Sequence, residues 1–195
     1  MKILGIETSC DETGVAIVEK KDNHFTVLAN VVATSLTLHA QTGGIIPETA
    51  AREQLKFMMP TLKKALKDGI DFTVTTKEVP EIDAIAVTYG PGLIGSLLVG
   101  VETAKTLSLL WNKPLIPVNH MYGHLYANWL EKSDIRLPAI ILVVSGNHTD
   151  LLLMQSQQTI RVLGGTRDDA AGEAFDKIGR LLGLTYPAGA MISRL

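Results

Sequence analysis

Three short strand patterns at the start of the chain constrain its fold more than any other feature. Residues 2–8, 14–20 and 25–34 are rich in apolar residues, and the polar segments SCDET and KDN separate them. Short polar connections of this kind are typical of neighbouring antiparallel strands. The start of the chain is therefore predicted to form an antiparallel meander.

Helical and strand patterns then alternate along the chain. Helices are predicted at 48–69, 93–110 and 120–131, and strands at 82–90 and 114–119. Pro47 suits the first turn of a helix, whereas Pro60 is predicted to kink or divide the helix that contains it. The alternation predicts that the sheet continues with parallel strands.

The strand pattern restarts at Pro138. Residues 138–145, 149–155 and 159–165 predict a second meander, and a helix is predicted from about Asp169 to Leu182. We therefore expect two α/β lobes, residues 1–137 and 138–195, with the ribonuclease-H-like fold of actin, Hsp70 and sugar kinases. The first lobe is expected to be complete, and the second to lack its later strands and helices.

Composition indicates which partners and which cellular location to expect for the chain. The formal net charge of -2 gives no general attraction for the phosphate backbone of a nucleic acid. Cys10 is the single cysteine, so a cytoplasmic location is expected. The first residues are too short an apolar run for a signal peptide. The apolar run 93–110 is interrupted by Glu102 and Lys105, which predicts a buried helix and no membrane association.

The segment HMYGH contains two histidines four residues apart. If it is helical, His120 and His124 project from one face and can share a metal ion. Neutral imidazole is a ligand for iron or zinc, and Gly123 leaves room for a substrate to approach. Met121 stands where the HExxH motif of zinc proteases has its glutamate, which disfavours peptide hydrolysis. A partly exposed histidine pair without a metal is the alternative.

Two polar turns are further candidates. SCDETG places Asp11 and Glu12 where they could contact a metal, water or a substrate amine, although an ordinary hairpin is the alternative. VVSGNHT ends a strand of the second lobe in a turn whose backbone amides could hold an anion. If the two turns face each other across a cleft between the lobes, a ligand could lie between them.

An acidic helix is predicted after the second meander. Asp168 or Asp169 is expected to cap it, and Asp169, Glu173 and Asp176 fall on nearly one face. This face is either simply solvated or provides Asp176 to a ribose hydroxyl. YPAG, residues 186–189, is expected beside it.

These segments together resemble the TsaD family, whose members transfer a threonylcarbamoyl group to adenosine in tRNA and were once described as O-sialoglycoprotein endopeptidases. The resemblance rests on SCDETG, HMYGH, VVSGNHT and DDAAGEAFDKIG in this order, and on the longer matches GIETSCDETG, YGPGLIGSLLVG and AAGEAFDKIGRLLGL. It covers all 195 residues and is similar to the amino-terminal part of the family.

The resemblance implies that threonylcarbamoyl-adenylate is the donor, that the adenosine beside the tRNA anticodon is the acceptor, and that AMP leaves. It implies a divalent metal, Fe²⁺ or alternatively Zn²⁺, on His120 and His124, and a catalytic role for Asp11. A TsaB-like paralogue and a TsaE-like ATPase are the implied partners. The implied adenylate contacts are Val143, Val144, Ser145, Gly146, Asn147, Asp176 and Gly189.

The sequence departs from the family pattern at several positions. SGGHT is SGNHT here, so Asn147 replaces a glycine, and YPGGP is YPAGA. Gln54 stands where the family has a histidine, and Tyr122 replaces the glutamate of HMEGH. The aspartate that is the family's remaining metal ligand, and an asparagine that contacts ribose, lie beyond the matched part.

Three alternatives to a transferase remain. A module that binds a partner without turnover fits an incomplete second lobe. The older metalloprotease description would require cleavage that depends on His124. A small-molecule kinase of the same superfold would not be expected to contain HMYGH.

Overall fold

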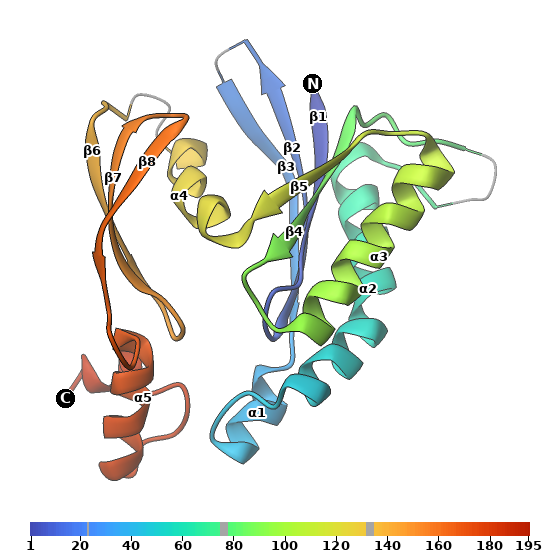
Figure 1. Cartoon of the computed structure of the whole chain (residues 1–195). Coiled ribbons are helices and arrows are strands. Elements are labelled where there is room, and N and C mark those ends of the chain that lie inside the picture. Colours follow the sequence, from blue (N-terminus) through green and yellow to red (C-terminus); the bar gives the residue numbers. More distant parts are fainter. Residues whose placement is uncertain (23, 75–77, 132–134) are drawn as a thin grey trace. The chain divides into compact units, whose positions relative to one another are not determined.

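The structure is a computed structural model that describes residues 1–22, 24–74, 78–131 and 135–195 (Figure 1). The chain divides into two units, Met1–Ser133 and Asp134–Leu195, and each contains its own sheet.

The sheet of the first unit has five strands in the order β3-β2-β1-β4-β5. Strands β1 (Lys2–Glu7), β2 (Glu12–Lys21) and β3 (His24–Thr34) pair antiparallel, which confirms the first meander. Strands β4 (Ala84–Gly90) and β5 (Leu115–Asn119) extend the sheet in parallel with β1, as predicted. The carboxyl ends of three parallel strands therefore lie at one edge.

The described residues of this unit form the helices α1 (Leu36–Thr42), α2 (Pro47–Ile70), α3 (Ile94–Trp111) and α4 (His120–Glu131). Of the two outcomes predicted for Pro60, a kink or a division of the helix, division was wrong, because α2 runs through Pro60. Buried Met58, Thr61 and Leu62 flank the proline, so packing on β2, β3 and α3 holds both sides in place. Helix α1 was not predicted.

Helices α2 and α3 cover one face of the five-stranded sheet, and α4 lies at the other face (Figure 1). Leu4 and Ile6 of β1 belong to the core beneath α2 and α3. Because side chains alternate along a strand, Glu7 points to the α4 face. This alternation places a carboxylate beside the histidines of α4.

Leu62 lies at the centre of this core and is fully buried. Leu62→Ala is expected to lower the free energy of unfolding by about 2–5 kcal/mol, because it leaves a cavity. Leu55→Ala on the same helix is the control, since Leu55 is 66% exposed, and its effect should stay within about 0.5 kcal/mol. Urea unfolding measures both, and equal effects would contradict this assignment of the core.

Helix α3 was predicted to be buried, and the structure buries one side of it. Ser96, Leu97 and Ala104 are buried where α3 packs on β4 and α2, whereas Leu109 is 86% exposed. By length and composition, α3 is the one helix in the described part of the chain that could cross a membrane. Core helices of soluble proteins pass the same test, and 33% of this 18-residue segment is buried in the structure.

The second unit contains an antiparallel sheet of β6 (Ala139–Val144), β7 (Thr149–Ser156) and β8 (Thr159–Gly165), as the repeated pattern predicted. Helices α5 (Ala171–Leu181) and α6 (Gly189–Ile192) follow. The predicted cap at Asp168 or Asp169 was wrong, because the N-cap residue of α5 is Ala170. Thr149 Oγ1 instead accepts a hydrogen bond from Ala171 N at 2.8 Å, so a strand residue satisfies the helix terminus.

Candidate metal and adenylate sites

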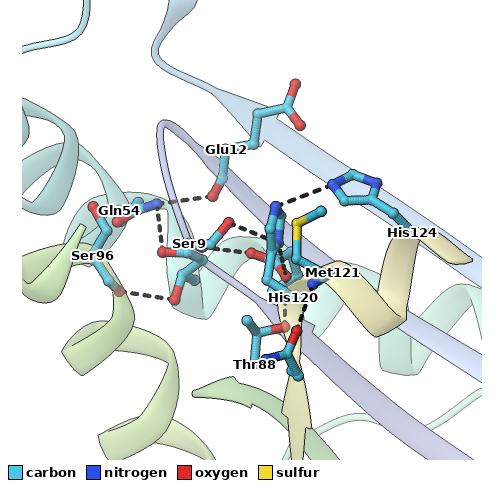
Figure 2. Close-up of polar contacts among 11 residues, drawn as sticks. Ser9, Glu12, Gln54, Thr88, Ser96, His120, Met121 and His124 are labelled. Carbon is cyan, nitrogen blue, oxygen red and sulfur yellow. Dashed lines mark hydrogen bonds and ion pairs between the residues drawn. The ribbon is translucent and has the colours of Figure 1, made fainter. Parts of the chain in front are cut away.

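Three residues that are distant in sequence meet at the carboxyl ends of the parallel strands, and Figure 2 labels two of them, Thr88 and His120. Glu7 ends β1, Thr88 lies near the end of β4, and His120 follows β5 directly. Ligand sites of α/β sheets commonly form at this edge, because the loops after the strands converge there. The contacts among these three side chains define the first candidate site.

The two histidines occupy successive turns of α4, as HMYGH predicted. Asn119 Oδ1 accepts a hydrogen bond from Met121 N at 2.9 Å and so satisfies one amide at the start of the helix. The two Nε2 atoms of His120 and His124 lie 3.0 Å apart, and the ring centroids are 4.5 Å apart. The two imidazoles therefore contact each other through their Nε2 atoms.

This pair fits a divalent metal. His120 and His124 would hold such an ion through their Nε2 atoms, because neutral imidazole nitrogen is a common ligand of divalent metals. Within the described residues, no group of three or more histidine, cysteine or carboxylate side chains could hold a metal together. The histidine pair of α4 is therefore a candidate for part of a metal site within the described part of the chain.

Glu7 is held on both of its oxygens. Oε1 accepts a hydrogen bond from Ser9 N at 2.5 Å, and Oε2 accepts one from Thr88 Oγ1 at 2.5 Å. Oε2 also lies 3.2 Å from His120 Nδ1. Burial raises the pKa of Glu7, but the hydrogen bonds from His120, Ser9 and Thr88 outweigh burial and lower the pKa to about 2. The carboxylate is therefore ionised at neutral pH.

The SCDET turn is fixed through its backbone by Gln54 of α2 (Figure 2). Gln54 Nε2 donates to the carbonyl oxygens of Glu12 at 2.8 Å and Cys10 at 3.1 Å. Ser96 Oγ also donates to Cys10 O at 2.9 Å, and Ser35 Oγ donates to Asp11 O at 2.9 Å. These bonds position the candidate catalytic residue Asp11 on a rigid turn beside Ser9.

Gln54→Met tests this clamp. The substitution leaves the part-buried carbonyls of Glu12 and Cys10 without their amide donor, so the free energy of unfolding is expected to fall by about 1–3 kcal/mol. Gln41→Met is the control because Gln41 is exposed on α1, and it should change stability by less than about 0.5 kcal/mol. Urea unfolding with equal midpoints for the two variants would show that Gln54 does not hold the turn.

Glu12 differs from Glu7 although both are close to the turn. Glu12 is an exposed residue at the start of β2. The pKa of its carboxyl is raised above the ordinary value, first by partial loss of solvent and then by the negative charges of Asp11 and Glu7. The turn thus concentrates negative charge next to the histidine pair. This potential favours a cation there.

The second candidate site lies in the turn after β6. Ser145 Oγ accepts hydrogen bonds from the amides of His148 at 2.9 Å and Asn147 at 3.3 Å, so these two amides are already used within the turn. Gly172 N donates to Ser145 O at 3.1 Å, which joins the turn to the first residues of α5. Val143 and Val144 end β6 directly before the turn.

Close packing explains the small residue at position 172. A Cβ atom there would lie 2.6 Å from Ser145 O and 2.8 Å from Gly146 N, so only glycine lets α5 approach the turn. Gly172 was not predicted as a site residue, although it stands in the AAGEAF segment. A small residue at the start of a helix is a signal for such an approach.

Asp176 contacts the segment that YPAG was expected to place beside it. Its Oδ1 accepts a hydrogen bond from Ala188 N at 2.7 Å, one residue before Gly189. On the same helix, Lys177 Nζ lies 2.7 Å from Asp169 and 3.1 Å from Glu173, so the acidic face is partly neutralised. The structure therefore joins Asp176 to the start of α6 and separates it in role from the ion-paired carboxylates.

Comparison with known proteins supplies the family context. A family model described as tRNA N6-adenosine threonylcarbamoyltransferase, TsaD, matches residues 26–195. Proteins of that name from Thermomicrobium roseum and Syntrophomonas wolfei are 51% and 52% identical to the chain, over 100% and 97% of its length. One from Dehalococcoides mccartyi is 48% identical over 100% of it. The chain spans 52–57% of these three relatives.

Solved structures agree on the fold. YeaZ from Pseudomonas aeruginosa has a TM-score of 0.50 at 18% identity, covering 84% of this chain and 65% of that one. The ethanolamine utilization protein EutJ from Carboxydothermus hydrogenoformans has a TM-score of 0.53 at 11% identity, covering 100% of this chain and 62% of that one. These likenesses confirm the expected actin-like, ribonuclease-H-like fold.

Proposed function

The chain belongs to the TsaD family of tRNA N6-adenosine threonylcarbamoyltransferases, and on that basis we propose that it carries the metal-binding and adenylate-binding parts of such a transferase. The acceptor is the adenosine beside the anticodon of tRNA, and the donor is threonylcarbamoyl-adenylate. The single observation that carries the proposal is the convergence of the two Nε2 atoms of α4 at 3.0 Å, next to the carboxyl ends of three parallel strands.

In the proposed reaction the exocyclic amine of adenosine attacks the carbamoyl carbon of the donor. A carbon–nitrogen bond forms, the bond between that carbon and the phosphate oxygen breaks, and AMP leaves while the amine loses a proton. His120 and His124 would hold Fe²⁺ or Zn²⁺ through Nε2, and such an ion would supply Lewis-acid polarisation of the donor.

The residues of the chain provide binding and orientation. Residues 143–147 and Gly189 form the binding surface for the adenylate, and the Asp176 carboxylate accepts a hydrogen bond from a ribose hydroxyl. Asp11 accepts the proton of the attacking amine. Gln54 and Ser35 hold the backbone of its turn in place. Correct placement of two reactants can lower a barrier by several kcal/mol, about 7–11 in the best intramolecular cases.

The proposal includes partners and a location. A smaller TsaB-like paralogue and a TsaE-like ATPase act with the chain in the cytoplasm, and the tRNA contacts are shared with them. The small net charge of -2 supports such sharing, because the chain as a whole does not attract a phosphate backbone.

The transfer reaction tests the proposal. The chain is mixed with the adenylate-forming enzyme, both partners, threonine, bicarbonate, ATP and tRNA, and threonylcarbamoyladenosine is measured by nucleoside mass spectrometry. A full-length relative serves as the control. Product that depends on the chain supports the proposal, whereas no product beside a working control contradicts it and leaves a partner-binding module as the explanation.

A further inference from the structure

Glu7 contacts a proposed metal ligand without being one of the proposed ligands. The geometry points to Glu7 as a positioning residue that fixes His120 in the tautomer with its proton on Nδ1. In this tautomer Nε2 carries no proton and could bind a metal. This inference rests on the proposed metal site. It assigns a role to a carboxylate that the sequence motifs did not single out.

The hydrogen-bonding roles around Glu7 determine the tautomer. An ionised carboxylate can only accept, so the group at 3.2 Å from Oε2, His120 Nδ1, must donate. Ser9 Oγ, 3.1 Å from the same nitrogen, can adapt to either role because a hydroxyl rotates. Neutral imidazole carries one proton, and with that proton on Nδ1 the Nε2 lone pair accepts a hydrogen bond from His124 Nε2 at 3.0 Å. The same lone pair would be available to a metal.

Two hydrogen bonds to Glu7 support this assignment, because they fix the position of its carboxylate. Ser9 N and Thr88 Oγ1 each donate at 2.5 Å to a different carboxylate oxygen, which fixes the plane of the carboxylate. Carboxylates that orient metal-binding histidines in this way raise the basicity of the ligand and select its tautomer. Thr88 and Ser9 therefore act on His120 through Glu7.

Glu7→Gln should reverse the tautomer of His120, although glutamine has nearly the same shape as glutamate. Ser9 N can only donate, so the amide oxygen of glutamine must take the Oε1 position, and its NH₂ group must take the Oε2 position. Thr88 Oγ1 can rotate to accept from this NH₂ group. His120 Nδ1 must then become an acceptor, which places the ring proton on Nε2 and directs it at the metal position.

Nitrogen NMR of the metal-free chain measures the tautomer at a pH about two units above the ordinary imidazole pKa of about 6.5. The expected result is protonated Nδ1 in the wild-type chain and protonated Nε2 in Glu7→Gln, with His120→Asn identifying the signals. A wild-type proton on Nε2 would overturn the inference. The wild-type spectrum alone decides it if the variant does not fold.

Zn²⁺ affinity, measured against a chelating dye, is the second readout. Glu7→Gln is expected to weaken Zn²⁺ binding by about 10–100-fold. Glu19→Gln removes the same charge from the same sheet, where Glu19 pairs with the exposed Lys21, and should change affinity less than about twofold. Equal affinity of Glu7→Gln and wild type would overturn the inference, whereas failure of the wild type to bind would instead contradict the proposed metal site.

Discussion

The double substitution His120→Ala and His124→Ala is expected to remove divalent metal from the chain and to abolish its contribution to transfer. The two Nε2 atoms at 3.0 Å are the proposed protein ligands, and no alternative group of three ligands exists in the described residues. Loss of a residue that merely orients a ligand costs about 10–100-fold in affinity, so loss of both ligands should exceed about 100-fold. Metal content after dialysis and Zn²⁺ titration measure the effect.

His24→Ala is the matched control for this double substitution. His24 is exposed at the start of β3, at the far end of the hairpin from the SCDET turn, and its removal should leave metal affinity unchanged. Circular dichroism and urea unfolding must show that the double variant is folded. Unchanged metal content and unchanged transfer in a folded double variant would refute the metal assignment.

Gly172→Ala is expected to weaken AMP binding by about tenfold or more. The new Cβ atom would lie 2.6 Å from Ser145 O and 2.7 Å from its carbonyl carbon, both backbone atoms of the proposed adenylate turn. Because backbone cannot rotate away, the turn and α5 must separate. Isothermal titration with AMP measures the loss.

Gly164→Ala separates this effect from a general response of glycines in the second unit. Gly164 lies in β8, and a Cβ atom there would meet nothing within 4 Å. Its AMP affinity should match that of the wild type. Equal AMP affinity of the wild type and of folded Gly172→Ala would show that the turn between β6 and β7 is not the adenylate surface.

The meanders and the parallel extension could be predicted because they depend on local patterns. Alternating apolar residues and short polar turns determine which strands are neighbours, and the strand orders of both sheets agree with the prediction. Helix α1 escaped prediction because it is held by distant contacts: Ser35 at its N-terminus donates to Asp11 O through both backbone and side chain. The cap of α5 failed for the same reason, since Thr149 on β7 replaces a local side chain.

The histidine pair could be predicted from spacing, because residues four apart share one face of a helix. The side chains that surround the pair could not be predicted in this way. Glu7 and His120 are 113 positions apart, and their contact depends on the register of β1, β4 and β5 together. Gln54 was noted only as a departure from the family histidine, and its bonds to the SCDET turn became evident only from the packing of α2.

The position of the metal tests the account most directly. The chain is crystallised with Fe²⁺ or Zn²⁺, and anomalous scattering at the absorption edge of the ion locates it. We expect one site with the ion about 2.1 Å from Nε2 of both His120 and His124, and with Glu7 on the far side of the His120 ring. An ion bound elsewhere, or one bound to His120 through Nδ1, would contradict the account.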